Sequence, residues 1–160
     1  MTRRLAALIL ACCSLPAVAS AESPADLRRV ASEYYRWRNE RYPVASSDQG
    51  LHTWDSRLTD HSASARSARR ARVSALIAQV QGMEASTWPR DDQVDRLLFL
   101  AQLEGADFFD RVLERPETDP QVYVDECANA IFSLLKKEYA PKRTRARIRI
   151  RVVWMRPTAT

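Results

Sequence analysis

Residues 91–112, DDQVDRLLFLAQLEGADFFDRV, carry the strongest helical pattern in the chain and decide its fold class. Small and apolar residues recur there at steps of four and three, at Val94, Leu98, Ala101, Gly105, Phe108 and Val112. This spacing predicts a helix with one narrow stripe that packs against another helix. We expect Asp91 or Asp92 to cap the helix, Pro116 to end it, and Gly105 to let a neighbouring backbone approach closely.

The helical period extends toward the N-terminus and predicts two more helices. The first begins with Ser23 as N-cap and Pro24 in the first turn, and stops at Pro43. Its expected apolar face consists of Leu27, Val30, Tyr34 and Trp37. The second begins at Ser62 or Ser64 and ends near Gly82. Its expected apolar face consists of Val73, Leu76, Ile77, Val80 and Met83, and we expect residues 44–60 to form a loop between the two helices.

A fourth helix is predicted between Asp119-Pro120 and Pro141. Its apolar face is expected at Val124, Ala128, Ile131 and Leu135, and Cys127 is expected to be a buried thiol. The sequence therefore predicts an all-α fold, with about four amphipathic helices over residues 22–141.

Residues 142–160 differ from the rest of the chain in charge and in period. Seven of the basic residues and no acidic residue lie there, and arginines alternate with other residues from Arg143 to Arg151. We expect a disordered basic tail, because a lone strand would have no sheet to join. Residues 22–141 hold sixteen basic and twenty acidic residues, which argues against a nucleic-acid partner.

Residues 1–21 have the composition of a signal peptide. Arg3 and Arg4 precede an apolar run, and Ala19-Ser20-Ala21 is a small-residue cleavage site before Glu22. The run is shorter than the roughly 20 residues that cross a bilayer, so we expect no transmembrane segment. The chain is expected to be exported to the periplasm or secreted. The alternative is a lipoprotein anchored through Cys12.

The loop before the second predicted helix holds the candidate site residues. His52, Trp54, Asp55, Arg57 and Asp60 lie close together in the sequence, and they either dock the loop onto the helices or form the wall of a binding cleft. His52 and His61 lack the spacing of a zinc pair on one helix face. No catalytic constellation is complete, so no catalytic, cofactor-binding or metal-ligating residue is assigned.

Several segments in order resemble the N-terminal part of the bacterial "domain of unknown function 885" family. They are Tyr42-Pro43, GLHTWDSRLTD at 50–60, DDQVD at 91–95, DPQVYV at 119–124, IFSLL at 131–135 and Tyr139-Ala140-Pro141. The resemblance covers about residues 27–145. It implies a large, helical, exported protein similar to zinc metallopeptidases, with an H-E-x-x-H helix in its C-terminal half.

This chain contains no H-E-x-x-H motif, so no zinc or catalytic residue of the family is carried over. The resemblance stops after Pro141, where the arginine-rich tail fits a shifted reading frame or a premature end of the gene. We expect an N-terminal fragment that is inactive alone, holds no zinc and self-associates through uncovered helix faces. The resemblance implies zinc and a peptide substrate for the full-length parent only. The alternative is a small helical periplasmic module that binds a partner.

Overall fold

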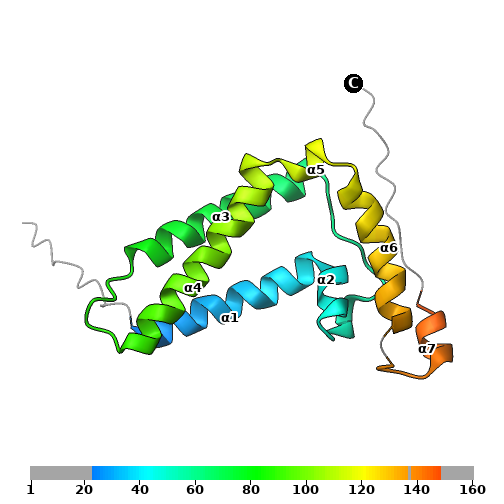
Figure 1. Ribbon diagram of the computed structural model, residues 1–160, viewed down its shortest axis with the longest axis horizontal. Coiled ribbons are helices and arrows are strands. Elements are labelled where there is room, and N and C mark those ends of the chain that lie inside the picture. The colour runs from blue at the N-terminus through cyan, green and yellow to red at the C-terminus, as the bar shows by residue number, and fades with distance from the viewer. Residues whose placement is uncertain (1–22, 137, 149–160) are drawn as a thin grey trace, which may run out of the picture.

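The computed structural model describes residues 23–136 and 138–148, and every regular element within them is a helix (Figure 1). The long helices are α1 (Pro24–Arg41), α3 (Ala63–Gly82), α4 (Arg90–Asp107) and α6 (Gln121–Lys136). The short ones are α2 (Pro43–Asp48), the 3₁₀-helix η1 (His52–Trp54), the π-helix η2 (Phe108–Val112), α5 (Arg115–Thr118) and α7 (Lys142–Ala146). The predicted all-α fold class is confirmed. The predicted leader lies outside the described residues.

The starts of α1 and α3 follow from their capping residues. The Ser23 hydroxyl accepts a hydrogen bond from the Asp26 backbone N–H at 3.3 Å, and the Asp26 carboxylate accepts one from the Ser23 N–H at 3.0 Å. This reciprocal pair is a capping box, which satisfies backbone donors that have no partner inside the helix. Ser62 caps α3 by accepting from the Ala65 N–H at 3.2 Å. Both predicted N-caps are therefore confirmed.

The core lies where α1, the end of α3, the segment before α4 and the second half of α4 converge. α3 and α4 form an antiparallel hairpin, and α1 runs beneath it (Figure 1). The buried cluster consists of Leu27, Val30, Tyr34, Val80, Met83, Trp88, Phe99 and Leu103. Trp37, Leu76 and Ile77 pack against this cluster. The predicted apolar faces of α1 and α3 are confirmed, because side chains at helical spacing on each helix meet in one core.

The faces predicted for α4 and α6 are not the faces that the described helices bury. On α4 the buried side chains are Phe99 and Leu103, whereas Leu98 of the predicted stripe is 64% exposed. A Cβ added at Gly105 would meet no atom within 4 Å, so the expected close approach at this glycine is wrong. On α6 the buried residues are Ala130, Ser133 and Leu134, and the predicted face is exposed.

The start and the end of α4 also differ from the prediction. The helix begins at Arg90 after Pro89, so Asp91 and Asp92 lie in the first turn instead of capping it. At its other end the helix widens into η2 at Phe108, before the expected stop at Pro116. Glu114 then adopts a left-handed backbone with φ of 47°, which reverses the chain toward α5 and α6.

Two segments expected to lack structure are partly helical. Residues 44–60 contain most of α2 and all of η1, because Pro43 starts a new helix after α1 ends. Lys142–Ala146 form α7, so the expectation of an unstructured tail is wrong for these residues. Arg145 explains the difference: its guanidinium donates to the carbonyl oxygens of Leu134 at 2.9 Å and Leu135 at 3.1 Å. Residues 149–160 lie outside the described residues.

Candidate functional site

A buried carboxylate holds together the loop that carries the predicted site residues. Asp55 lies just after η1, and its side chain is 6% exposed. His52 Nδ1 lies 3.1 Å and 3.2 Å from its two oxygens, and the Ser47 hydroxyl of α2 donates to it. Tyr139, which lies 84 residues along the chain, donates its hydroxyl to Asp55 Oδ2 at 2.7 Å. Three donors on one carboxylate satisfy the charge that burial would otherwise make costly.

The ring of Tyr139 also stacks on His52, with the ring centroids 3.3 Å apart and the planes 8° from parallel. Burial, together with the hydrogen bond to Asp55 and its charge, raises the pKa of Tyr139 to about 12. The phenol therefore stays protonated and remains a donor over the physiological pH range. This cluster ties the loop to the segment that follows α6.

The other predicted residues of the loop do not join this cluster. Arg57 is half-exposed and lies 3.8 Å from Glu40 of α1. The carboxylate of Asp60 accepts from the Ser62 N–H, which lowers its pKa, and its carbonyl oxygen accepts from Arg69 Nη1 at 2.6 Å. Trp54 is partly buried, and its carbonyl oxygen accepts from the Arg57 N–H at 2.9 Å. These contacts fit the loop-docking interpretation.

A cavity of about 490 Å³ lies beside this loop, at the end of the fold where α1 diverges from the α3–α4 hairpin. Its lining comes from the second half of α1, the first half of α3 and the second half of α4, closed by η2, α5 and α6. None of the five predicted loop residues lines it, but His61 does. The interpretation of those five residues as a cleft wall therefore has no support from this cavity.

His61 has unusual surroundings for a histidine. Neither ring nitrogen has a hydrogen-bond partner among the described residues, although both are buried. Burial is the largest cause that lowers its pKa, and the charges of Arg69 and Arg66 act in the same direction. The ring meets Tyr123 edge to face, with the centroids 4.9 Å apart. His61 is therefore a neutral imidazole with an unused donor and an unused acceptor.

Large apolar side chains are exposed on α4, η2 and α6. On α4 and η2 the exposed ones are Val94, Leu97, Leu98, Phe108, Phe109 and Val112; on α6 they are Tyr123, Val124, Ile131, Phe132 and Leu135. Leu135 is 70% exposed and Val124 is 58% exposed. Large apolar surface marks an interaction site in soluble proteins when such side chains adjoin one another. We call these two sets the α4 face and the α6 face.

The structure also defines the surroundings of the metal-ligand and nucleophile side chains among the described residues. No group of three or more histidine, cysteine, aspartate or glutamate side chains in the ranges 23–136 and 138–148 could hold a metal ion. Cys127 is exposed on α6, so the expectation of a buried thiol is wrong. The Ser47 hydroxyl contacts Asp55 instead of His52, which is not the serine–histidine contact that activates a nucleophile.

Sequence reasoning missed Tyr139 and Ser47 as partners of Asp55, and it missed Arg69 in the cavity. The i,i+3 spacing of His52 and Asp55 was a usable signal, because it puts both side chains on one side of a helical turn. Nothing in the sequence pairs Asp55 with Tyr139.

No protein-family model, curated protein or solved structure matches this chain.

Proposed function

We propose that this chain is the N-terminal helical segment of a larger exported protein similar to zinc metallopeptidases, and that it is inactive without the part that carries the zinc site. The exposed α4 and α6 faces carry this proposal. They include side chains that helical periodicity marks for packing, and these are exposed in the described structure: Leu98, Phe108 and Val112 on α4 and η2, and Val124, Ile131 and Leu135 on α6. Further helices of the parent protein would cover both.

The energetics of these faces favour an additional layer of structure. Full burial of one leucine, isoleucine or phenylalanine side chain stabilises a protein by about 1.5 to 3 kcal/mol. Leu98, Ile131 and Phe132 each have more than half of their surface exposed. Covering the two faces would therefore offset part of the conformational entropy that ordering these helices costs.

Export is part of the proposal and rests on the composition of residues 1–21, which lie outside the described residues. None of the helices in the described part of the chain combines the length and the apolar character that a membrane crossing requires. In the parent, a zinc-bound water would hydrolyse a peptide with glutamate as general base, and that chemistry belongs to residues outside this chain. We expect this chain alone to bind no stoichiometric zinc and to cleave no peptide.

The alternative proposal is a small helical periplasmic module that binds a partner through the same faces. The closed core of α1, α3 and α4 favours it, because Val80 and Leu103 are fully buried without any further helix. A module of this kind folds alone and meets its partner as a separate protein.

The DNA that follows the codon for Thr160 separates the two proposals. The fragment proposal predicts that another frame continues with helical sequence and later encodes H-E-x-x-H. An unrelated gene or an intergenic region directly downstream would contradict it and favour the module. Metal analysis is a second test: one tightly bound zinc per purified chain, lost in His52→Ala, would contradict the assignment of the zinc site to the missing part.

A further inference from the structure

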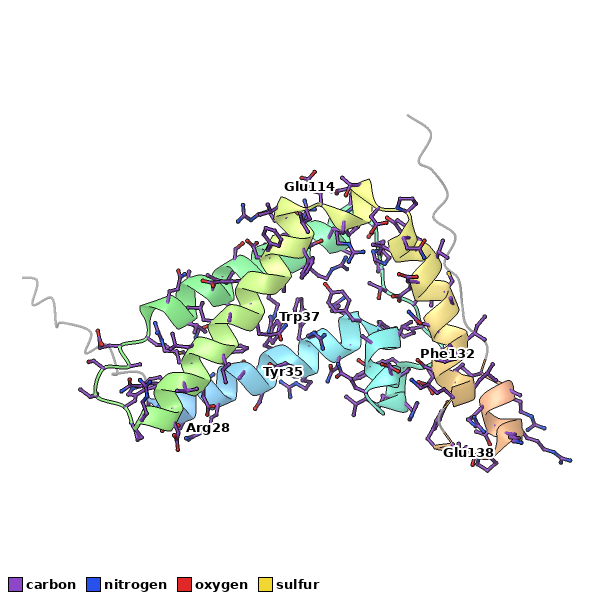
Figure 2. The ribbon with its side chains drawn as sticks, in the orientation of Figure 1. Arg28, Tyr35, Trp37, Glu114, Phe132 and Glu138 are labelled. Atoms are coloured by element: carbon purple, nitrogen blue, oxygen red, sulfur yellow. The ribbon has the colours of Figure 1, made fainter. Side chains whose placement is uncertain are left out.

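The cavity between α1 and the α3–α4 hairpin has the size and lining of a small-molecule site. Its volume of about 490 Å³ falls within the roughly 300 to 1,000 Å³ typical of ligand pockets. Four aromatic rings line it, from Tyr34, Trp37, Tyr42 and Phe109. Figure 2 shows Trp37 projecting from α1 toward the α3–α4 hairpin, where its ring also meets Arg72 of α3.

Some of the arginines that line the cavity form ion pairs with carboxylates, and others do not. Arg70 pairs with Asp110 and Glu117, and Arg115 pairs with Asp119 at 2.7 Å. Arg38 and Arg69 also line the cavity, and neither is among the arginines that pair with a carboxylate in residues 23–136 and 138–148. An arginine without an anionic partner is costly when buried.

Arg69 is the more buried of the two unpaired arginines. Its residue is 4% exposed, its Nη1 donates to the Asp60 carbonyl oxygen, and its Nε has no partner among the described residues. Its guanidinium carbon lies 5.5 Å from the centroid of the Tyr42 ring. Burial raises the pKa of Tyr42, the charge of Asp110 acts in the same direction, and the charges of Arg69 and Arg38 oppose both. Arg69 therefore lies beside the Tyr42 ring, and Arg38 lines the same cavity.

The two carboxylates of the lining already have cationic partners, because Asp107 pairs with Arg111 and Asp110 pairs with Arg70. Among the described lining residues, the charges of Arg38 and Arg69 are the ones left for an anionic ligand. His61 is neutral and keeps an unused N–H donor beside the arginines. A carboxylate, with one negative charge and two acceptor oxygens, fits these donors. The aromatic rings of the lining fit an apolar group that carries the carboxylate.

We propose that this cavity binds a monocarboxylate carried on an apolar group, with Arg38 and Arg69 holding the carboxylate and Trp37 contacting the apolar group. The carboxylate would accept hydrogen bonds from the guanidinium groups and from His61. The ligand is either a free aromatic or aliphatic acid or the C-terminus of a peptide, because both present this chemistry. The cavity belongs to the described residues alone, so this inference goes beyond the proposed function and does not depend on it.

The test compares 3-phenylpropionate with its neutral amide, of nearly the same shape, and with inorganic phosphate. Binding to the purified chain is followed by calorimetry and by tryptophan fluorescence. We expect the acid to saturate one site and to bind at least about tenfold more tightly than the amide, because charge-assisted hydrogen bonds are the stronger ones. Phosphate should bind more weakly than the acid. Equal affinity for acid and amide, or tighter binding of phosphate, would overturn the proposal.

Variants test the residue assignment. Arg38→Gln should weaken binding of the acid about tenfold and leave binding of the amide unchanged. Arg36→Gln, at an exposed position on the same helix, should change neither and serves as the matched control. Arg69→Lys keeps the positive charge but removes the planar pair of guanidinium donors, so it should also weaken binding of the acid. A helical, folded Arg38→Gln protein with unchanged affinity would overturn the proposal.

The source of the ligand requires one further comparison. A pentapeptide that ends in phenylalanine with a free carboxylate is titrated beside 3-phenylpropionate and beside the same peptide with an amidated end. If the peptide with a free carboxylate binds more tightly than 3-phenylpropionate, the natural ligand is a peptide C-terminus. If 3-phenylpropionate binds more tightly, the natural ligand is a free acid. If Arg38→Gln changed the affinity of neither carboxylate, the carboxylate assignment would fail for both sources.

Discussion

Two leucines five residues apart on α4 allow a direct test of which face of this helix is buried. Leu103 is completely buried in the core, and Leu98 is 64% exposed on the α4 face. Leu→Ala removes three carbon atoms, each worth about 0.8 kcal/mol when fully buried, and leaves a cavity where the site cannot collapse. We therefore expect Leu103→Ala to lower the free energy of unfolding by about 3 to 4 kcal/mol.

Leu98→Ala should cost about 1 kcal/mol or less, because only about a third of its surface is buried and water fills the space it leaves. The higher helix propensity of alanine reduces the cost further. Both values come from urea titrations followed by circular dichroism at one protein concentration. If Leu98→Ala proved as destabilising as Leu103→Ala, the assignment of the buried face of α4 would be wrong.

Three further predictions concern the polar contacts. Burial lowers the pKa of His61, so burying its neutral form contributes stability at neutral pH. This stability is lost as the pH falls below about 6.5 and through the lowered pKa. The urea midpoints of unfolding at about pH 7 and pH 5 should therefore differ less in His61→Phe than in the wild type. The pKa of Tyr139 is raised to about 12. The stability that its protonated hydroxyl contributes is therefore lost as the pH rises from about 10 through about 12. In a titration followed by phenol absorbance, Tyr139→Phe should remove the ionisation step near pH 12. Arg145→Ala should speed hydrogen exchange in the last turn of α6 by removing donors worth about 1.5 to 3 kcal/mol each, whereas Arg143→Ala at an exposed position should not.

Local sequence signals were sufficient for the helices and for two of their buried faces. Ser23 and Ser62 are capping residues whose side chains act within three positions of themselves, so their effect is visible in the sequence. On α1 the apolar residues form a single stripe, with Leu27, Val30 and Tyr34 on one side and charged residues around them. Periodicity then leaves one choice of buried face.

α4 is different because its sequence is apolar on more than one side. Residues 97–100 are Leu-Leu-Phe-Leu, four consecutive apolar positions that point in directions about 100° apart around the helix. Several stripes are then possible, and the neighbouring helices decide which one is buried. The stripe through Leu98 has the regular spacing, but α1 and α3 cover the side with Phe99 and Leu103. Periodicity identified the helix and could not identify its partners.

The candidate site shows the same division between local and distant contacts. His52 and Asp55 are three residues apart, so their contact is a local one, although the sequence analysis named both residues without pairing them. Tyr139 reaches Asp55 across 84 residues, and no local pattern predicts such a contact. The cavity likewise depends on how α1 diverges from the α3–α4 hairpin. The sequence positions of Arg38 and Arg69 therefore could not show that both residues line it.

The most direct test of the central proposal is sedimentation velocity of the purified chain over a range of concentrations. If the α4 and α6 faces are surfaces that a larger protein covers, the isolated chain should self-associate as its concentration rises. Leu98→Glu together with Leu135→Glu should shift it toward the monomer, whereas glutamate at two exposed polar positions, Arg36 and Gln102, should not. A chain that stays a monodisperse monomer and unfolds in one sharp transition would contradict the fragment proposal and favour the independent binding module.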